Sequence, residues 1–166
     1  MHRPPRKYRM ITPLLTVSGP LSPENVDFLK QGGCRKILSI GGGFIHPDVV
    51  PHVKKNQMEV MYYPFPDCSD LKETQESLKR VFSQLTHLLE SGSRVHVAGD
   101  VSLTDVACLV GAIRKLQDWE LGNILFEASD ISDSVEVSDL ISAIHSFYAV
   151  PRSLPFNTGG LKNEHA

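Results

Sequence analysis

Two residues with the types and spacing for phosphate chemistry lie in the second half of the chain. Cys108 and Arg114 are separated by five residues within ACLVGAIRKL. A thiolate can attack phosphorus, and a guanidinium can bind two phosphate oxygens at once, but the pair needs a loop whose backbone amides turn inward. Cys108 instead falls in an apolar run typical of a helix, where six residues rotate by about 600°. We therefore expect a buried structural thiol at this position.

The segment HVAGDVSLT stands where a ligand-binding loop belongs. RVHVAG, from Arg94 to Gly99, is an apolar run of strand length, and a helical pattern follows from Thr104 to Gln117. Ligands of α/β folds bind at the carboxyl ends of strands. The candidate loop comprises His96, Val97, Ala98, Gly99, Asp100, Val101, Ser102, Leu103 and Thr104.

The sequence around this loop, VHVAGDVSLTDVACLVGAIRKLQDW, resembles the segment VHCxxGKxRTGxLVGxxRKLQxW. The matches are Val95-His96, Thr104, Leu109-Val110-Gly111, Arg114-Lys115-Leu116-Gln117 and Trp119. That segment belongs to the plant and fungal atypical dual-specificity phosphatases, a family of the cysteine-phosphatase superfamily that includes inositol-pyrophosphate phosphatases and oxidant-induced cell-cycle arrest proteins. A less specific likeness, including SGPLSPENVDFLK, extends from about Ile11 to Pro155.

The departures from the family pattern fall on the residues that chemistry needs. The resemblance places Val97 at the nucleophile position and Leu103 at the arginine position. Asp100 stands at the loop glycine, where its charge would oppose a phosphate, and Asp105 replaces the glycine at which the loop meets its helix. The resemblance therefore implies an inactive loop that binds phosphate poorly.

Two acidic residues and a histidine have alternative interpretations. Asp67 and Asp70, in YPFPDCSD, resemble the general-acid loop of the superfamily, but an acid without a nucleophile has nothing to protonate. We favour a loop or helix-capping role for both. His96, which precedes the cysteine in the family, is expected to be a hydrogen-bonded packing residue.

Apolar runs of strand length alternate with helical patterns, which is typical of an α/β domain. We expect an edge strand over Met10–Val17, a helix from Ser22 to Gly32-Gly33, strands over Arg35–Ile40 and Glu59–Phe65, and a helix from Leu71 to Gly92. Further helices are expected at Glu120–Ala128 and Val137–Tyr148. The resemblance implies the cysteine-phosphatase fold, with a central four- or five-stranded sheet flanked by helices. We expect residues 1–9 to form a basic N-terminal arm, 10–150 the phosphatase-like domain and 151–166 a disordered tail.

Composition excludes several classes of protein. A formal net charge of -2 gives no overall attraction to nucleic acid, and no apolar run is long enough to cross a membrane. The three cysteines and seven histidines show no spacing typical of metal ligands, so we expect neither a metal nor a cofactor. The sequence favours a cytoplasmic protein.

The resulting hypothesis is a pseudophosphatase that acts as a non-catalytic subunit or regulator of active phosphatases of the same family. Leu121 and Leu125, four residues apart, are predicted to form an apolar stripe for a partner. One alternative is a module that binds an inositol polyphosphate or a phosphoprotein without turnover, with Lys54, Lys55 or the N-terminal arm supplying positive charge. A second is an active tyrosine, dual-specificity or inositol-pyrophosphate phosphatase with an unusual nucleophile, Ser102 or Cys68.

Overall fold

The computed structural model describes residues 2–41, 45–63, 65, 70–134 and 136–147. In chain order the elements are β1 (Arg9–Thr12), β2 (Leu15–Ser18), α1 (Pro23–Gln31), β3 (Cys34–Ser39), α2 (Val50–Lys55), β4 (Glu59–Tyr62), α3 (Leu71–Glu90), β5 (Arg94–Ala98), α4 (Thr104–Leu116), α5 (Leu121–Ile131) and α6 (Glu136–Phe147). The strands form one five-stranded sheet in the order β1-β2-β5-β3-β4, within the range expected. No helix in the described ranges has the length and apolar character that crossing a membrane requires.

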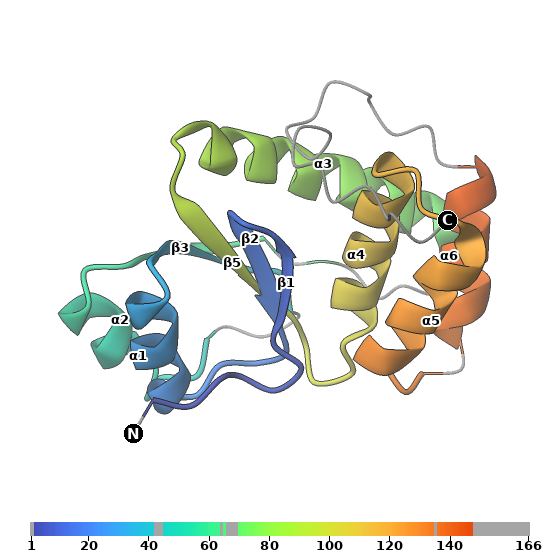
Figure 1. Cartoon of the computed structure of the whole chain (residues 1–166). Coiled ribbons are helices and arrows are strands. Elements are labelled where there is room, and N and C mark those ends of the chain that lie inside the picture. The colour runs from blue at the N-terminus through green and yellow to red at the C-terminus, as the bar shows by residue number, and fades with distance from the viewer. Residues whose placement is uncertain (1, 42–44, 64, 66–69, 135, 148–166) are drawn as a thin grey trace.

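Helices flank the sheet on both faces (Figure 1). One hydrophobic cluster joins α1 and α2 to the face that carries Ile37 and Ala98. A larger cluster joins α3, α4, α5 and α6 to the opposite face, through side chains such as Val17, Leu38 and Val97. This is the three-layer arrangement that alternating strands and helices predict.

The single strand expected over Met10–Val17 is a hairpin instead. β1 pairs antiparallel with β2, and β2 pairs parallel with β5. Pro13 lacks an N–H and interrupts the ladder, and Thr12 Oγ1 accepts a hydrogen bond from the N–H of Leu14 in the turn (3.3 Å). Of these two strands, only β1 lies at an edge of the sheet, and β2 lies inside it between β1 and β5.

Residues at the ends of α1 and α3 explain where these helices begin and stop. Pro23 begins α1, and the N–H of Ser22 donates to Asn25 Oδ1 (2.7 Å). Asp70 caps α3 by accepting a hydrogen bond from the N–H of Lys72 (2.9 Å), and Gly92 follows the helix with a positive φ of 73°. The short helix α2, with Val53 buried, was missed because six residues carry too little periodicity.

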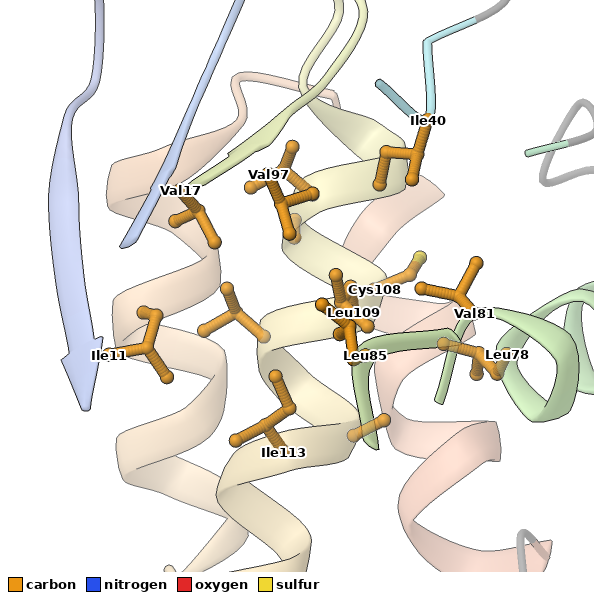
Figure 2. Close-up of a cluster of buried hydrophobic side chains, with 14 of the residues drawn as sticks. Ile11, Val17, Ile40, Leu78, Val81, Leu85, Val97, Cys108, Leu109 and Ile113 are labelled. Carbon is orange, nitrogen blue, oxygen red and sulfur yellow. The ribbon is translucent and has the colours of Figure 1, made fainter. Parts of the chain in front are cut away.

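Helix α4 runs through the middle of the larger cluster (Figure 2). Every residue from position 105 to 114 is buried, because the sheet covers one side of the helix and other helices cover the rest. A Cβ built on Gly111 would lie 3.3 Å from Ile141, so the small residue allows α6 to approach closely. Cys108 is fully buried on this helix, as predicted.

The N-terminal arm is fixed at several points. Asn25 Nδ2 donates to the carbonyl oxygen of Arg3 (2.9 Å), and the Tyr8 ring meets Phe28 edge-on with centroids 5.1 Å apart. Pro5 is buried. The side chains of Arg3 and Arg6 are exposed, as expected for a basic arm, but the backbone that carries them is packed on the domain.

Candidate functional site

The candidate loop lies at the carboxyl edge of the parallel strands. Ser18 of β2 and Ser39 of β3 are both in register with Ala98, the last residue of β5. The chain leaves this edge at Gly99 and enters α4 at Thr104. The loop predicted from the sequence is therefore in the place where α/β folds bind ligands, although its first three residues belong to the strand.

Val97 cannot present a side chain to a ligand at this edge. It lies inside β5 opposite Val17 and Leu38, is fully buried, and faces α4 (Figure 2). Leu109 lies twelve positions after Val97 in this chain. In the family segment, the leucine of LVG lies only ten positions after the cysteine. The two sequence matches on either side of the loop are therefore not in one register.

Because β5 and α4 are each continuous, this chain can be aligned with the family segment in two ways. Strand β5 and helix α4 are unbroken, so two inserted residues would have to lie in the loop 99–103 if Val97 keeps the cysteine position. Without an insertion, the cysteine and arginine positions fall on Gly99 and Asp105. Neither register brings a thiol or a guanidinium to the loop.

The Asp105 side chain accepts hydrogen bonds that hold the loop, so it does more than replace a glycine. Its Oδ2 accepts the N–H of Asp100 (3.0 Å) and its Oδ1 accepts the N–H of Val106 (2.7 Å). Burial raises the pKa of Asp105, the two N–H groups lower it, and the charge of Asp100 raises it further. The sequence interpretation missed this role, although an acidic residue in the first turn of a helix is a common anion at a helix N-terminus.

Leu103 has an unusual backbone conformation for its residue type. Its φ is 59°, in the left-handed region, immediately before α4 begins. Such a conformation costs about 1–2 kcal/mol for a residue other than glycine. The side chain is buried in the core, and its Cδ2 atom would lie 3.3 Å from a Cβ built on Gly19. This packing offsets the cost of the strained backbone at Leu103.

The loop is also packed against the end of β3. A Cβ built on Gly41 would lie 3.1 Å from the backbone of Gly99 and from the N atom of Asp100. That distance is closer than nearly all real Cβ contacts, so the two backbone segments meet only because residue 41 is glycine. The carboxyl edge of the sheet is thus closely filled on the β3 side.

His96 is a packing residue, as predicted. Ser18 Oγ donates to the carbonyl oxygen of Gly19 (2.8 Å), so it accepts a hydrogen bond from His96 Nε2–H (2.8 Å). His96 Nδ1 then accepts the hydroxyl of Thr16 (2.8 Å), which fixes the neutral Nε2–H tautomer. Burial lowers the pKa of His96 to about 3, and the Tyr8 ring stacks on it with centroids 6.0 Å apart.

The cysteines in the described part of the chain lie away from the loop. Cys34 begins β3 at the opposite edge of the sheet, and burial raises the pKa of its thiol to about 11. Cys108 is buried among the side chains shown in Figure 2. Arg114 is also buried, and its guanidinium forms two hydrogen bonds with Glu127 (2.8 and 3.1 Å) and lies 4.0 Å from the centre of the Trp119 ring. The C-x5-R pair in α4 is therefore structural.

The remaining candidates for acid, nucleophile or metal ligand are distributed as follows. Asp70 caps α3, as predicted, whereas Asp67 and Cys68 lie outside the described residues. Ser102 is exposed; its Oγ accepts the N–H of Thr104 at 3.4 Å, and no base contacts it in the described part of the chain. No cluster of three metal-ligating side chains occurs there either.

The predicted partner stripe on α5, Leu121 and Leu125, is partly exposed. Leu125 packs against the larger core and Leu121 is half-buried. The exposed large side chain of α5 is Phe126, at 80%. Ile124 is buried and Trp119 packs against the core. Leu121 and Leu125 each keep part of their surface exposed, and their contact with a partner stays a prediction.

The basic residues named for an anion site lie at different edges. Lys54 and Lys55 are the last residues of α2, and β4 begins a few residues later, paired with Lys36 near the start of β3. Both lysines therefore lie near the amino ends of the parallel strands, whereas the loop lies at their carboxyl ends. The arm is different: the carbonyl oxygen of Arg6 accepts the N–H of Gly19 (3.0 Å), and Gly19 adjoins Leu103. Arg6 is thus an exposed basic residue of the arm whose backbone lies beside the loop.

No protein-family model and no curated protein matches the sequence. Solved structures do match the fold. The core catalytic domain of the PP-IP phosphatase SIW14 from S. cerevisiae, in complex with citrate, aligns with a TM-score of 0.70 and 17% identity over 90% of this chain and 89% of that one.

Two bacterial structures also align. A DUF442 protein from Shewanella putrefaciens CN-32 gives a TM-score of 0.61 and 17% identity over 87% of this chain and 95% of that one. A variant of TpbA from P. aeruginosa in complex with pTyr gives 0.58 and 15% over 82% and 89%. At these identities the likeness establishes the architecture alone: this chain has the cysteine-phosphatase fold.

Proposed function

We propose that this chain is a catalytically inactive phosphatase-like protein that acts as a non-catalytic subunit or regulator of active phosphatases of the same family. One observation carries the proposal: in either register, the loop lacks the thiol and the guanidinium that the chemistry needs. Loss of a covalent nucleophile alone reduces turnover by roughly a millionfold in a well-studied hydrolase.

The preserved packing around the loop supports a role for the fold itself. His96 is buried and joins β5 to β2 through Thr16 and Ser18, while the buried Leu103 packs in the core and the buried Asp105 accepts hydrogen bonds from loop and helix N–H groups. A domain that keeps this order without the reactive groups is suited to binding through its surface. The likeness to phosphatases such as SIW14 supports a partner of the same fold, because related surfaces often associate.

The experiment is affinity purification of the tagged chain from its own cells, followed by an aryl-phosphate hydrolysis assay of the eluate. We expect phosphatase activity in the eluate above that of a tag-only control. Mass spectrometry should then identify an active phosphatase of this fold in the same fraction. An eluate with no more activity than the tag control, from cells in which the tagged chain is folded, would contradict the regulatory role.

A second candidate function is the binding of an inositol polyphosphate at the rim of the loop. The position of Arg6, beside Gly19 and exposed, favours this candidate over one that uses Lys54 or Lys55. A calorimetric titration with inositol hexakisphosphate tests it, with Arg6→Ala as the variant and Lys54→Ala as the matched loss of charge at the opposite edge. Rim binding requires that only Arg6→Ala weakens the affinity.

A further inference from the structure

The loop's amides already have an anionic partner within the chain. The carboxylate of Asp105 accepts the N–H groups of Asp100 and Val106 with a different oxygen for each (3.0 and 2.7 Å). Two oxygens of a phosphate would make the same kind of contact with amides at the start of a helix. Asp105 is only 6% exposed, so the carboxylate lies within the loop rather than at its mouth.

The same carboxylate fills the space above the end of β5. A Cβ built on Gly99 would lie 2.8 Å from Asp105 Oδ1 and 2.2 Å from Val106 Cγ2, both closer than real Cβ atoms come. A side chain at residue 99 and the present position of Asp105 therefore exclude one another. In the register without an insertion, residue 99 takes the cysteine position of the family pattern, so any side chain at that position would meet Val106 and the Asp105 carboxylate.

We propose that the Asp105 carboxylate occupies the oxyanion position of the loop and thereby excludes phosphate and phosphate esters from it. The inference deepens the proposed function and rests on it, since a loop that turned over phosphate esters would first have to bind them. The inference makes a narrower claim than the proposed function, namely that Asp105 determines which ligands the loop rejects.

Two physical effects support this exclusion. A carboxylate tethered to the loop has a high effective concentration, so an external anion at millimolar concentration competes poorly for the same two N–H groups. An external phosphate that entered beside Asp105 would also meet a like charge in a partly desolvated place. The raised pKa of Asp105 agrees with this desolvation, because burial is its largest cause.

The experiment measures binding of inorganic phosphate to the full chain and to Asp105→Ala at constant ionic strength, by isothermal calorimetry. Asp105 has helical backbone geometry, so alanine adds no strain while it uncovers the N–H groups of Asp100 and Val106. We expect at least tenfold tighter phosphate binding in Asp105→Ala than in the unmodified chain. Glu120→Gln is the matched control, because it removes one exposed negative charge beyond the other end of α4, away from the loop, and it should give less than a threefold change.

The proposal is overturned if folded Asp105→Ala binds phosphate no more tightly than the unmodified chain, or if Glu120→Gln gives an equal gain. If Asp105→Ala does not fold, the unmodified chain decides: the amide resonances of Asp100 and Val106 should not move on addition of phosphate, and movement of both would contradict the proposal. Neither result depends on turnover or on a partner, so a failure here is distinguishable from a failure of the proposed function.

Discussion

Lowering the pH should destabilise this domain through His96. The folded ring is neutral, with a pKa of about 3, while an unfolded histidine has the ordinary value of about 6.5. Below pH 6.5 the unfolded chain therefore binds a proton that the folded chain does not. The contribution of His96 to stability is complete above pH 6.5 and is lost as the pH falls toward 3.

The size of the effect follows from the two pKa values. Each unit is worth about 1.36 kcal/mol, so the free energy of unfolding should fall by about 2–3 kcal/mol between pH 7 and pH 4.5 from this group alone. Other groups titrate in the same range, so the measurement has to be a difference. His96→Gln removes the titrating ring and leaves the carboxylates in place.

Urea unfolding followed by the fluorescence of Trp119, the chain's one tryptophan, supplies both stability curves. We expect His96→Gln to be less stable than the unmodified chain at pH 7, with the difference in the free energy of unfolding smaller by about 2–3 kcal/mol at pH 4.5. His87→Gln, at an exposed position, is the control and should run parallel to the unmodified chain. Parallel curves for His96→Gln would refute the buried neutral histidine.

Three further predictions concern packing. Glu127→Ala should lower the free energy of unfolding by about 3–5 kcal/mol, because it leaves the Arg114 guanidinium buried without its carboxylate partner. The control Glu76→Ala, which breaks the exposed pair with Lys79 (3.3 Å), should lower it by less than about 1 kcal/mol. Similar losses for the two variants in urea unfolding would be inconsistent with this difference. Gly99→Ala should destabilise the domain by about 1–3 kcal/mol through the clash with Val106 Cγ2, and Val106→Ala should partly rescue it; additive losses would show that the clash is not the cause. Maleimide should label Cys34 and Cys108 only as the domain unfolds, since both are buried, while Cys68 is expected to react first; rapid labelling of Cys108 in folded protein, read by mass spectrometry, would count against its place in the core.

The layers of the fold could be predicted because long segments carry clear periodicity. The apolar face of α3 and the caps Ser22 and Asp70 are local features, and the structure confirms each of them. The hairpin of β1 and β2 was missed because a proline in an apolar run is compatible with an interrupted edge strand as well as with a turn. Which strands pair depends on segments far apart in the sequence, so the sequence of one segment does not determine its partner.

The candidate site was predicted in place but not in detail. The order strand, loop, helix located the segment from Gly99 to Thr104. The register could not be found from matching letters, because matches before and after the loop disagree by two residues. The role of Asp105 depends on a bend that returns its carboxylate to the N–H of Asp100, and the exposure of Phe126 rather than Leu125 depends on how α5 is rotated against the core.

The central claim is that the chain does not hydrolyse phosphate esters. The most direct test is turnover by the purified full chain, with a generic aryl phosphate and with an inositol pyrophosphate, compared with a double variant, Cys68→Ser with Ser102→Ala. The account predicts no turnover above the no-protein background for either protein on either substrate. Turnover by the unmodified chain would contradict it: if the double variant abolished that turnover, Cys68 or Ser102 would be the nucleophile, and if the turnover persisted, the active site would lie outside this loop.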